Sequence, residues 1–160
     1  MAYSTSKATC HFSGPVKWLL ISALLILVAC SKDEQLPFSD KPEIELIGVS
    51  HDTIREYEDV LIITISYQDG NGDLGFENPD EYALYVRDLR LANFDGFYIG
   101  PLSPPGSNVP ITGKLNIEFP SLFLFGNRTA ETTRFEVKMV DRSGLESNVL
   151  LTDPVVIIKP

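Results

Sequence analysis

Cysteine and histidine are the scarcest reactive residues in this chain of 160 residues, with two of each. Both cysteines lie within the first 30 residues, so the rest of the chain cannot form an internal disulfide. A zinc site with several histidine and cysteine ligands is excluded by number alone. After residue 29 a Ser-His-Asp triad would have to use His51, and no Gly-x-Ser-x-Gly sequence or glycine-rich phosphate loop is present. We therefore do not expect an enzyme of these classes.

Basic residues are also few, with 13 lysines and arginines against 22 aspartates and glutamates and a net charge of −9. If residues 1–29 are removed, 11 basic residues remain against 22 acidic ones, and the net charge becomes −11. Such a surface repels nucleic acid and anionic lipid headgroups but is compatible with divalent cations. We expect no nucleic-acid partner.

The one long apolar run is too short to cross a membrane. Trp18–Ala29 is apolar apart from Ser22, and its 12 residues fall below the roughly 20 that a spanning helix needs. Lysines precede the run, and Cys30 follows its small residues. This is the pattern of a secretory signal peptide, and a cysteine directly after the cut resembles the lipobox of bacterial lipoproteins. We predict a signal peptide over 1–29 and a lipid anchor on Cys30; the alternative is an ordinary signal with an incidental cysteine.

Residues 30–42 are polar and include two prolines, which predicts an extended tether without a core. From residue 43 to 160 the pattern is that of strands, and no helical period is sustained; Asn78–Glu81 indicates at most a single turn. Short apolar-alternating or β-branched runs occur at 43–49, 60–67, 82–88, 96–99, 111–119, 134–140 and 148–158, the last broken at Asp153-Pro154. About seven such strands predict an all-β protein, an antiparallel β-sandwich.

An acidic loop follows the strand with the most β-branched residues. Asp69, Asn71 and Asp73 place oxygen side chains at alternate positions with glycines between them, an arrangement that can surround Ca²⁺. The pattern overlaps an EF-hand loop but has Leu74 in place of the turn glycine and Asp80 in place of the bidentate glutamate. We take all four oxygen-bearing residues as candidate calcium ligands. The alternative is a plain turn, because Asn-Gly and Asp-Gly favour turns.

Antiparallel pairing places the 68–81 and 141–147 loops at one end of the sandwich, where Asp141 would complete the ion site. The 43–49 strand begins at that end, next to the tether. The 93–110 and 120–132 loops are expected at the opposite end. They carry aromatic residues that would either bind a sugar or protein partner or cap the core, and the candidates for partner binding are Phe94, Phe97, Tyr98, Phe123 and Phe125.

Two motifs resemble a family of surface lipoproteins of the Bacteroidota. These proteins carry an Asp-Gly-Asp-Gly-Asp-Ile-Gly motif after a strand, to which Asp69–Gly75 is similar, and an Asp-Arg-Ala-Gly turn followed by Ser-Asn, to which Asp141–Asn148 is similar. The resemblance spans roughly 43–160 and implies an immunoglobulin- or fibronectin-III-like sandwich. Because the family is largely uncharacterised, the resemblance implies little about activity.

The same phylum suggests two processing signals. Lys32, Asp33 and Glu34 resemble the Lys-acidic-acidic signal that sends lipoproteins to the outer face of the outer membrane; the alternative is a solvated tether. Asp52-Thr53-Ile54 fits an O-glycosylation pattern of these bacteria, with the glycan on Thr53.

Three functions remain as hypotheses. The first is a non-catalytic binding or accessory module, lipid-anchored in the outer membrane and facing outward. The second is a purely structural spacer in an envelope assembly, and the third is a small carbohydrate-active enzyme that uses a carboxylate pair. Exposed aromatic residues on the loops would favour the first, a featureless polar end the second, and two carboxylates about 5–10 Å apart in a cleft the third.

Overall fold

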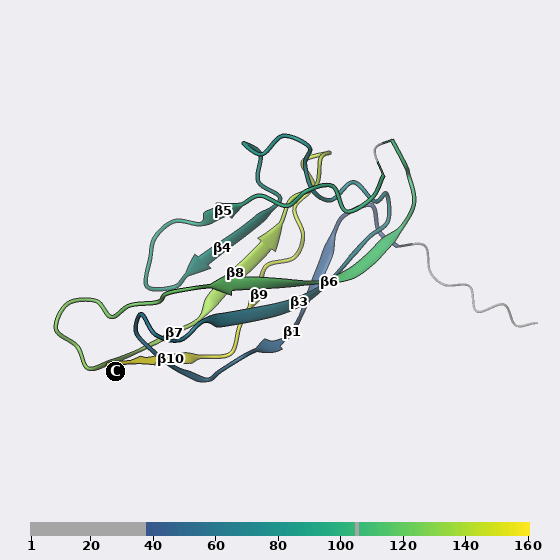
Figure 1. Ribbon diagram of the computed structural model, residues 1–160. Helices are drawn as coiled ribbons and strands as arrows, with labels where there is room; N and C mark the ends of the chain where they lie inside the picture. Colours follow the sequence, from purple (N-terminus) through teal and green to yellow (C-terminus); the bar gives the residue numbers. More distant parts are fainter. Residues whose placement is uncertain (1–37, 105) are drawn as a thin grey trace, which may run out of the picture. The chain divides into compact units, whose positions relative to one another are not determined.

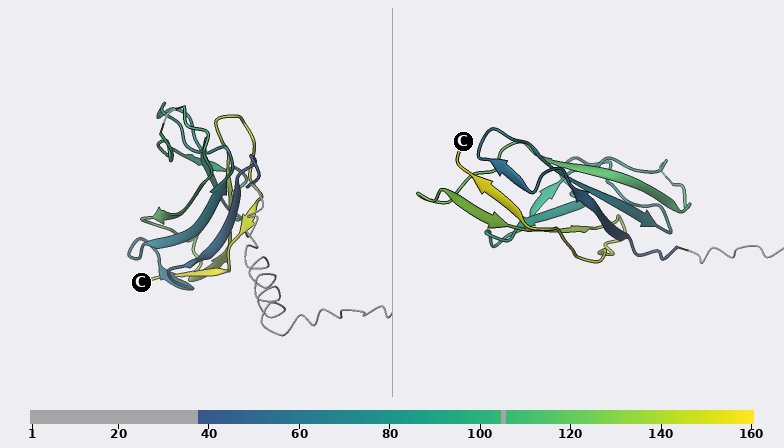
Figure 2. Two further views of the ribbon diagram at one scale, coloured as in Figure 1. Left: turned by 90° about the vertical axis from the view of Figure 1, so that its right-hand side faces the viewer. Right: turned by 90° about the horizontal axis from the view of Figure 1, so that it is seen from below.

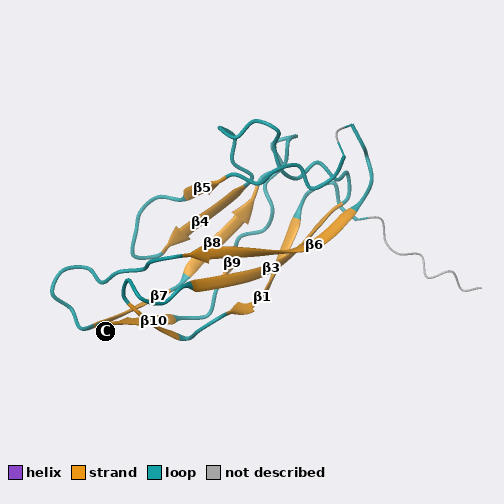
Figure 3. Ribbon diagram, viewed as in Figure 1, coloured by secondary structure: helices purple, strands orange, loops and turns teal. Residues whose placement is uncertain are grey.

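The computed structural model describes residues 38–104 and 106–160. The predicted signal peptide, the lipidation site Cys30, the export signal Lys32, Asp33 and Glu34, and most of the tether lie outside the described residues. Within those residues the chain is all-β: it has no helix and is built from strands joined by loops and turns (Figure 3). This confirms the predicted class, which the alternation of apolar and polar residues had indicated.

Ten strands make up the domain (Figure 1). They are β1 (Glu43–Val49), β2 (Thr53–Arg55), β3 (Leu61–Asp69), β4 (Leu84–Asp88), β5 (Asp95–Phe97), β6 (Ile111–Phe119), β7 (Ala130–Thr133), β8 (Phe135–Met139), β9 (Leu150–Leu151) and β10 (Val155–Ile158). The predicted break at Asp153-Pro154 separates β9 from β10, as expected where proline removes a backbone donor. The count exceeds the seven expected because the short strands β2 and β7 were not predicted and the last run forms two strands.

The strands form three sheets, in the orders β1-β3-β6, β2-β10-β7 and β5-β4-β8-β9. All pairs are antiparallel except β2 with β10, which run parallel, so the expectation of purely antiparallel pairing was wrong for this pair. The paired residues of β2 and β10 lie about a hundred positions apart in the sequence. Nothing in the three residues of β2 indicates which strand they pair with.

The core lies beneath the long central strand β3. Leu61, Ile63 and Ile65 alternate along this strand and are fully buried. They belong to one apolar cluster with residues of the other sheets, such as Val137 of β8 and Ile157 of β10. β3 therefore runs along the length of the domain, with Leu61 near one end and Asp69 near the other.

Loops gather at the two ends of the strands (Figure 2), and the two ends differ in the side chains that they carry. At the end that we call the aspartate pole, Asp69 ends β3, the chain enters at Phe38, and the 141–147 turn lies beside the 69–75 loop, as predicted. At the other end, which we call the aromatic pole, the 55–59 turn and the 120–126 loop meet through the bond from the Tyr57 N–H to the carbonyl of Leu122 (3.1 Å).

The expected position of the 93–110 segment was wrong for its second half. The N–H of Leu102 donates to the carbonyl of Leu74 (3.1 Å), and the N–H of Phe76 donates to the carbonyl of Ile99 (2.9 Å). Residues 99–104 and 106–109 thus lie at the aspartate pole. The reason is β5, which pairs antiparallel with β4 and carries the chain back to the end where β4 begins.

Candidate metal centre

The 69–75 loop turns sharply as β3 ends, and its glycines permit this path. Gly72 has a φ of 69°, in the left-handed region that side chains disfavour. A Cβ at this position would also overlap the carbonyl oxygen of Val109. The turn therefore packs against the backbone of Val109 closely enough that only glycine fits.

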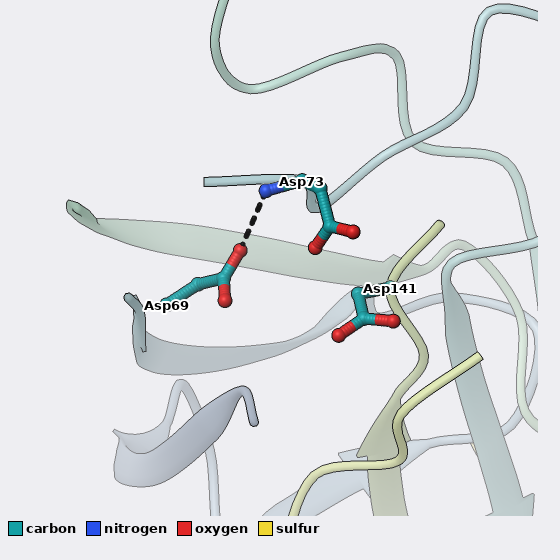
Figure 4. A group of neighbouring side chains, drawn as sticks. All are labelled: Asp69, Asp73 and Asp141. Atoms are coloured by element: carbon teal, nitrogen blue, oxygen red, sulfur yellow. Dashed lines mark hydrogen bonds between the residues drawn. The ribbon is translucent and has the colours of Figure 1, made fainter. Parts of the chain in front are cut away.

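Three carboxylates meet at this loop: Asp69 at the end of β3, Asp73 in the loop and Asp141 two residues after the end of β8 (Figure 4). Each offers one oxygen, and these oxygens lie within 4.8 Å of one another. Asp141 reaches the loop because its backbone forms a β-bridge with Leu74. Leu74 is fully buried in the core, which explains why leucine stands where an EF-hand has its turn glycine. We call these three residues the aspartate cluster.

Each carboxylate of the aspartate cluster has one oxygen that accepts a hydrogen bond. The Asp73 N–H donates to Asp69 Oδ2 (2.8 Å), the Leu145 N–H donates to Asp141 Oδ1 (2.8 Å), and the Ser143 hydroxyl donates to Asp73 Oδ2 (2.6 Å). The other three oxygens, Asp69 Oδ1, Asp73 Oδ1 and Asp141 Oδ2, are buried and have no partner in the described part of the chain. One oxygen of each residue is thus fixed in place, and the other is left free beside its neighbours.

Burial and mutual repulsion make this arrangement costly without a cation. Asp69 and Asp141 are 0% and 1% exposed. Burial raises the pKa of both carboxyls, and the charge of Asp73 raises them further. None of the ion pairs between described residues includes a member of the cluster, and the nearby Arg142 donates instead to the carbonyl of Gly75 (3.2 Å). Three hard oxygen ligands without a positive partner can hold a metal ion.

The two remaining predicted ligands lie differently. Asn71 is in the loop, and its Oδ1 accepts a hydrogen bond from the Asp73 N–H (3.2 Å), the same group that donates to Asp69. Asp80 is exposed and lies outside the cluster, so the structure does not bring it to the site. Its N–H donates to Asn78 Oδ1 (3.1 Å), inside the single turn predicted for Asn78–Glu81.

The predicted aromatic residues of the 93–110 segment do not gather into one patch. Phe97 packs against the core and meets Phe119 edge-on at 6.1 Å between ring centroids. Phe94 lies under the guanidinium of Arg87, 4.9 Å from its ring centroid. Tyr98 is exposed. The core-capping alternative, which concerned Phe97, Phe123 and Phe125, therefore describes Phe97.

Phe123 and Phe125 do lie together at the aromatic pole, 5.3 Å apart between ring centroids. Phe123 also stacks on Tyr57, at 6.2 Å and 7° between ring planes. The sequence reasoning missed Tyr57, although its neighbourhood of charged residues within a turn could have marked an exposed ring. Thr53, the glycosylation candidate, is exposed in β2, and nothing in the structure tests its modification.

No family model matches the chain, and no curated protein and no solved structure matched it either. Among the described residues there is no helix long and apolar enough to span a membrane.

Proposed function

We propose that this protein is a lipoprotein of the outer membrane, anchored through Cys30 and facing outward, whose domain is a non-catalytic binding or accessory module stabilised by calcium. In this proposal the three sheets form an immunoglobulin- or fibronectin-III-like sandwich. The observation that carries the calcium part is the set of three buried carboxylate oxygens without a partner. An acidic site of this kind is stable in an apolar surrounding when a cation neutralises it.

The chemistry of the ligands favours Ca²⁺ over other common metals. All the cluster's donors are oxygens, whereas zinc and copper sites draw on histidine and cysteine. The one histidine of the described residues, His51, is exposed and lies within hydrogen-bonding distance of Ser50 Oγ (3.0 Å) instead. Calcium takes about six to eight oxygens at roughly 2.3–2.6 Å, and loop carbonyls, Asn71 and water can supply those that the cluster does not.

The anchor and its export are tested with the full-length protein in a Bacteroidota host. Cys30→Ser is expected to lose lipid in intact-protein mass spectrometry and to leave the membrane fraction. Cys10→Ser is the matched control and should keep both, because it lies in the segment that is removed. Equal membrane retention of the two variants would refute lipidation at Cys30.

Outward exposure needs a separate variant. Replacing Lys32, Asp33 and Glu34 together with alanine should leave the lipid in place but protect the protein from protease added to intact cells. If this variant is digested as fast as the wild type, the three residues are part of the tether only.

A further inference from the structure

The aromatic pole contains a cavity of about 180 Å³ that neither the lipid anchor nor the aspartate cluster uses. Four phenylalanines line it, from β6, the 120–126 loop and β8: Phe119, Phe123, Phe125 and Phe135. Asp95 and Ser121 contribute polar side chains from exposed positions, and the paired Asp88 and Arg90 line the cavity as well. A site of this kind, with apolar rings and a few placed polar groups, is the usual form of a ligand pocket.

A strained tyrosine extends the apolar surface beyond the cavity. Tyr57 is the only residue other than glycine with a positive φ (62°) among those that the structure describes. Tyr57 is 66% exposed, and its ring stacks on that of Phe123, a residue that is 40% exposed. A non-glycine residue in this conformation is costly, and such strain is commonly found where a side chain has a functional position to keep.

A network of ion pairs around Arg90 fixes the positions of the Phe123 backbone and the Phe125 ring. Arg90 pairs with Asp88 (2.6 Å) and Glu131 (2.8 Å), donates to the carbonyl of Phe123 (2.8 Å), and lies 4.8 Å from the ring centroid of Phe125. Burial works to raise the pKa of both acids, but the hydrogen bonds that they accept outweigh it and lower the pKa, so they stay ionised. These charges are satisfied by one another, and their effect is to fix the loop before any ligand arrives.

We propose that the aromatic pole binds a neutral carbohydrate, with one sugar ring in the cavity that Phe123 lines and the adjoining ring on the free face of Tyr57. An engineered cavity of about 150 Å³ holds benzene. A sugar ring is bulkier, so it can enter this cavity of about 180 Å³ only with part of its hydroxyls outside, beside the exposed Asp95, Ser121 and Phe123. Ring faces suit the C–H face of a sugar, while the oxygens of Asp95 and Ser121 suit its hydroxyls. A net charge of −9 disfavours phosphates, nucleic acids and acidic sugars.

The position of this site suits a domain that is tethered to the membrane at its aspartate pole. β3 spans nine residues between the 55–59 turn and Asp69, a length of about 30 Å at roughly 3.3 Å per residue. The part of the cavity formed by the 120–126 loop therefore lies at the end of the domain opposite the pole where the chain enters at Phe38. It is separate from the aspartate cluster, so failure of the carbohydrate proposal would leave the calcium proposal unchanged.

The test is affinity electrophoresis of the full-length lipoprotein in detergent, at fixed calcium, through gels that contain starch, galactomannan, xyloglucan or β-1,3-glucan. At least one of these should retard the wild type. Tyr57→Gly is the informative variant, because glycine accepts a positive φ without strain. Its melting temperature should not fall, whereas its affinity should fall by about tenfold or more, as for other central aromatic contacts.

Tyr98→Ala is the matched control, since Tyr98 is an exposed aromatic residue outside the aromatic pole; it should bind as the wild type does. Phe123→Leu gives a second variant that keeps the loop apolar. The proposal is overturned if none of the four polysaccharides retards the wild type, or if Tyr57→Gly and Phe123→Leu are both retarded as strongly as the wild type.

Discussion

Replacing Asp69 with asparagine separates the charge of the aspartate cluster from its shape. Asp69 Oδ2 accepts the Asp73 N–H, and the amide oxygen of asparagine can keep this bond. The amide NH₂ then takes the place of Oδ1, where it faces the free oxygens of Asp73 and Asp141 as a donor. We therefore expect Asp69→Asn to lose calcium binding and yet to be more stable than the wild type when calcium is absent.

The size of both effects can be worked out from the geometry. Two unit charges at the 4.8 Å limit of the cluster repel by about 3.5 kcal/mol at an effective dielectric constant of about 20. Partial protonation and relaxation reduce this, so we expect a net gain of about 1–3 kcal/mol, the range for satisfying a buried polar group. For a domain of this size that corresponds to about 5–10 °C in melting temperature.

Calcium should stabilise the wild type by a comparable amount. Extracellular calcium sites bind with a Kd of about 0.1–1 mM, so about 10 mM calcium can reach roughly a hundred times the Kd. Such saturation contributes about 2.7 kcal/mol, or about 10 °C. Asp69→Asn should show a calcium shift below about 2 °C.

The assay is thermal unfolding followed by circular dichroism, with chelator and with calcium. Asp80→Asn is the control, because Asp80 is an exposed aspartate close in sequence but outside the cluster; it should keep the full calcium shift. The reasoning fails if calcium raises the melting temperature of Asp69→Asn as much as that of the wild type. It also fails if Asp69→Asn melts below the wild type in chelator.

Three further predictions concern the same pole. Because burial raises the pKa values of Asp69 and Asp141 above those of the unfolded chain, the calcium-free domain should be more stable at about pH 5 than at neutral pH. Chemical denaturation in chelator measures this, and the same pH dependence in Asp69→Asn as in the wild type would contradict it. Gly72→Ala should lower the free energy of unfolding by about 3 kcal/mol or more, because the new Cβ would be strained and would overlap Val109. Gly144→Ala, at a φ of 81° in open space, should lower it by about 1–2 kcal/mol in the same assay. Equal losses would show that the contact with Val109 is unimportant. The N–H of Gly70 donates to the carbonyl of Ser39 (2.8 Å), which links the 69–75 loop to the start of the domain. Loss of calcium should therefore loosen the segment at Phe38 and Ser39 and speed chymotrypsin cleavage after Phe38. An unchanged cleavage rate would show that this segment does not respond to the aspartate cluster.

The sequence predicted most where a residue's role depends on its near neighbours. The strands at 43–49 and 111–119 match β1 and β6 to the residue, because the alternation that defines a half-buried strand is local. β2 and β7 were missed because short strands with exposed residues acquire their identity from pairing with β10. In the candidate site, Asp69 and Asp73 followed from spacing, and Asp141 followed from the order of antiparallel strands.

What the sequence by itself determined is therefore the all-β character, the strand alternation and the acidic loop, each of which is a property of a few consecutive residues. Only the tertiary structure decided that Asp80 stays outside the aspartate cluster, that Leu102 and Val109 contact its loop, and that Tyr57 stacks on Phe123. The physical reason is that these outcomes depend on which distant strands pair, and pairing is chosen by burial of the whole core.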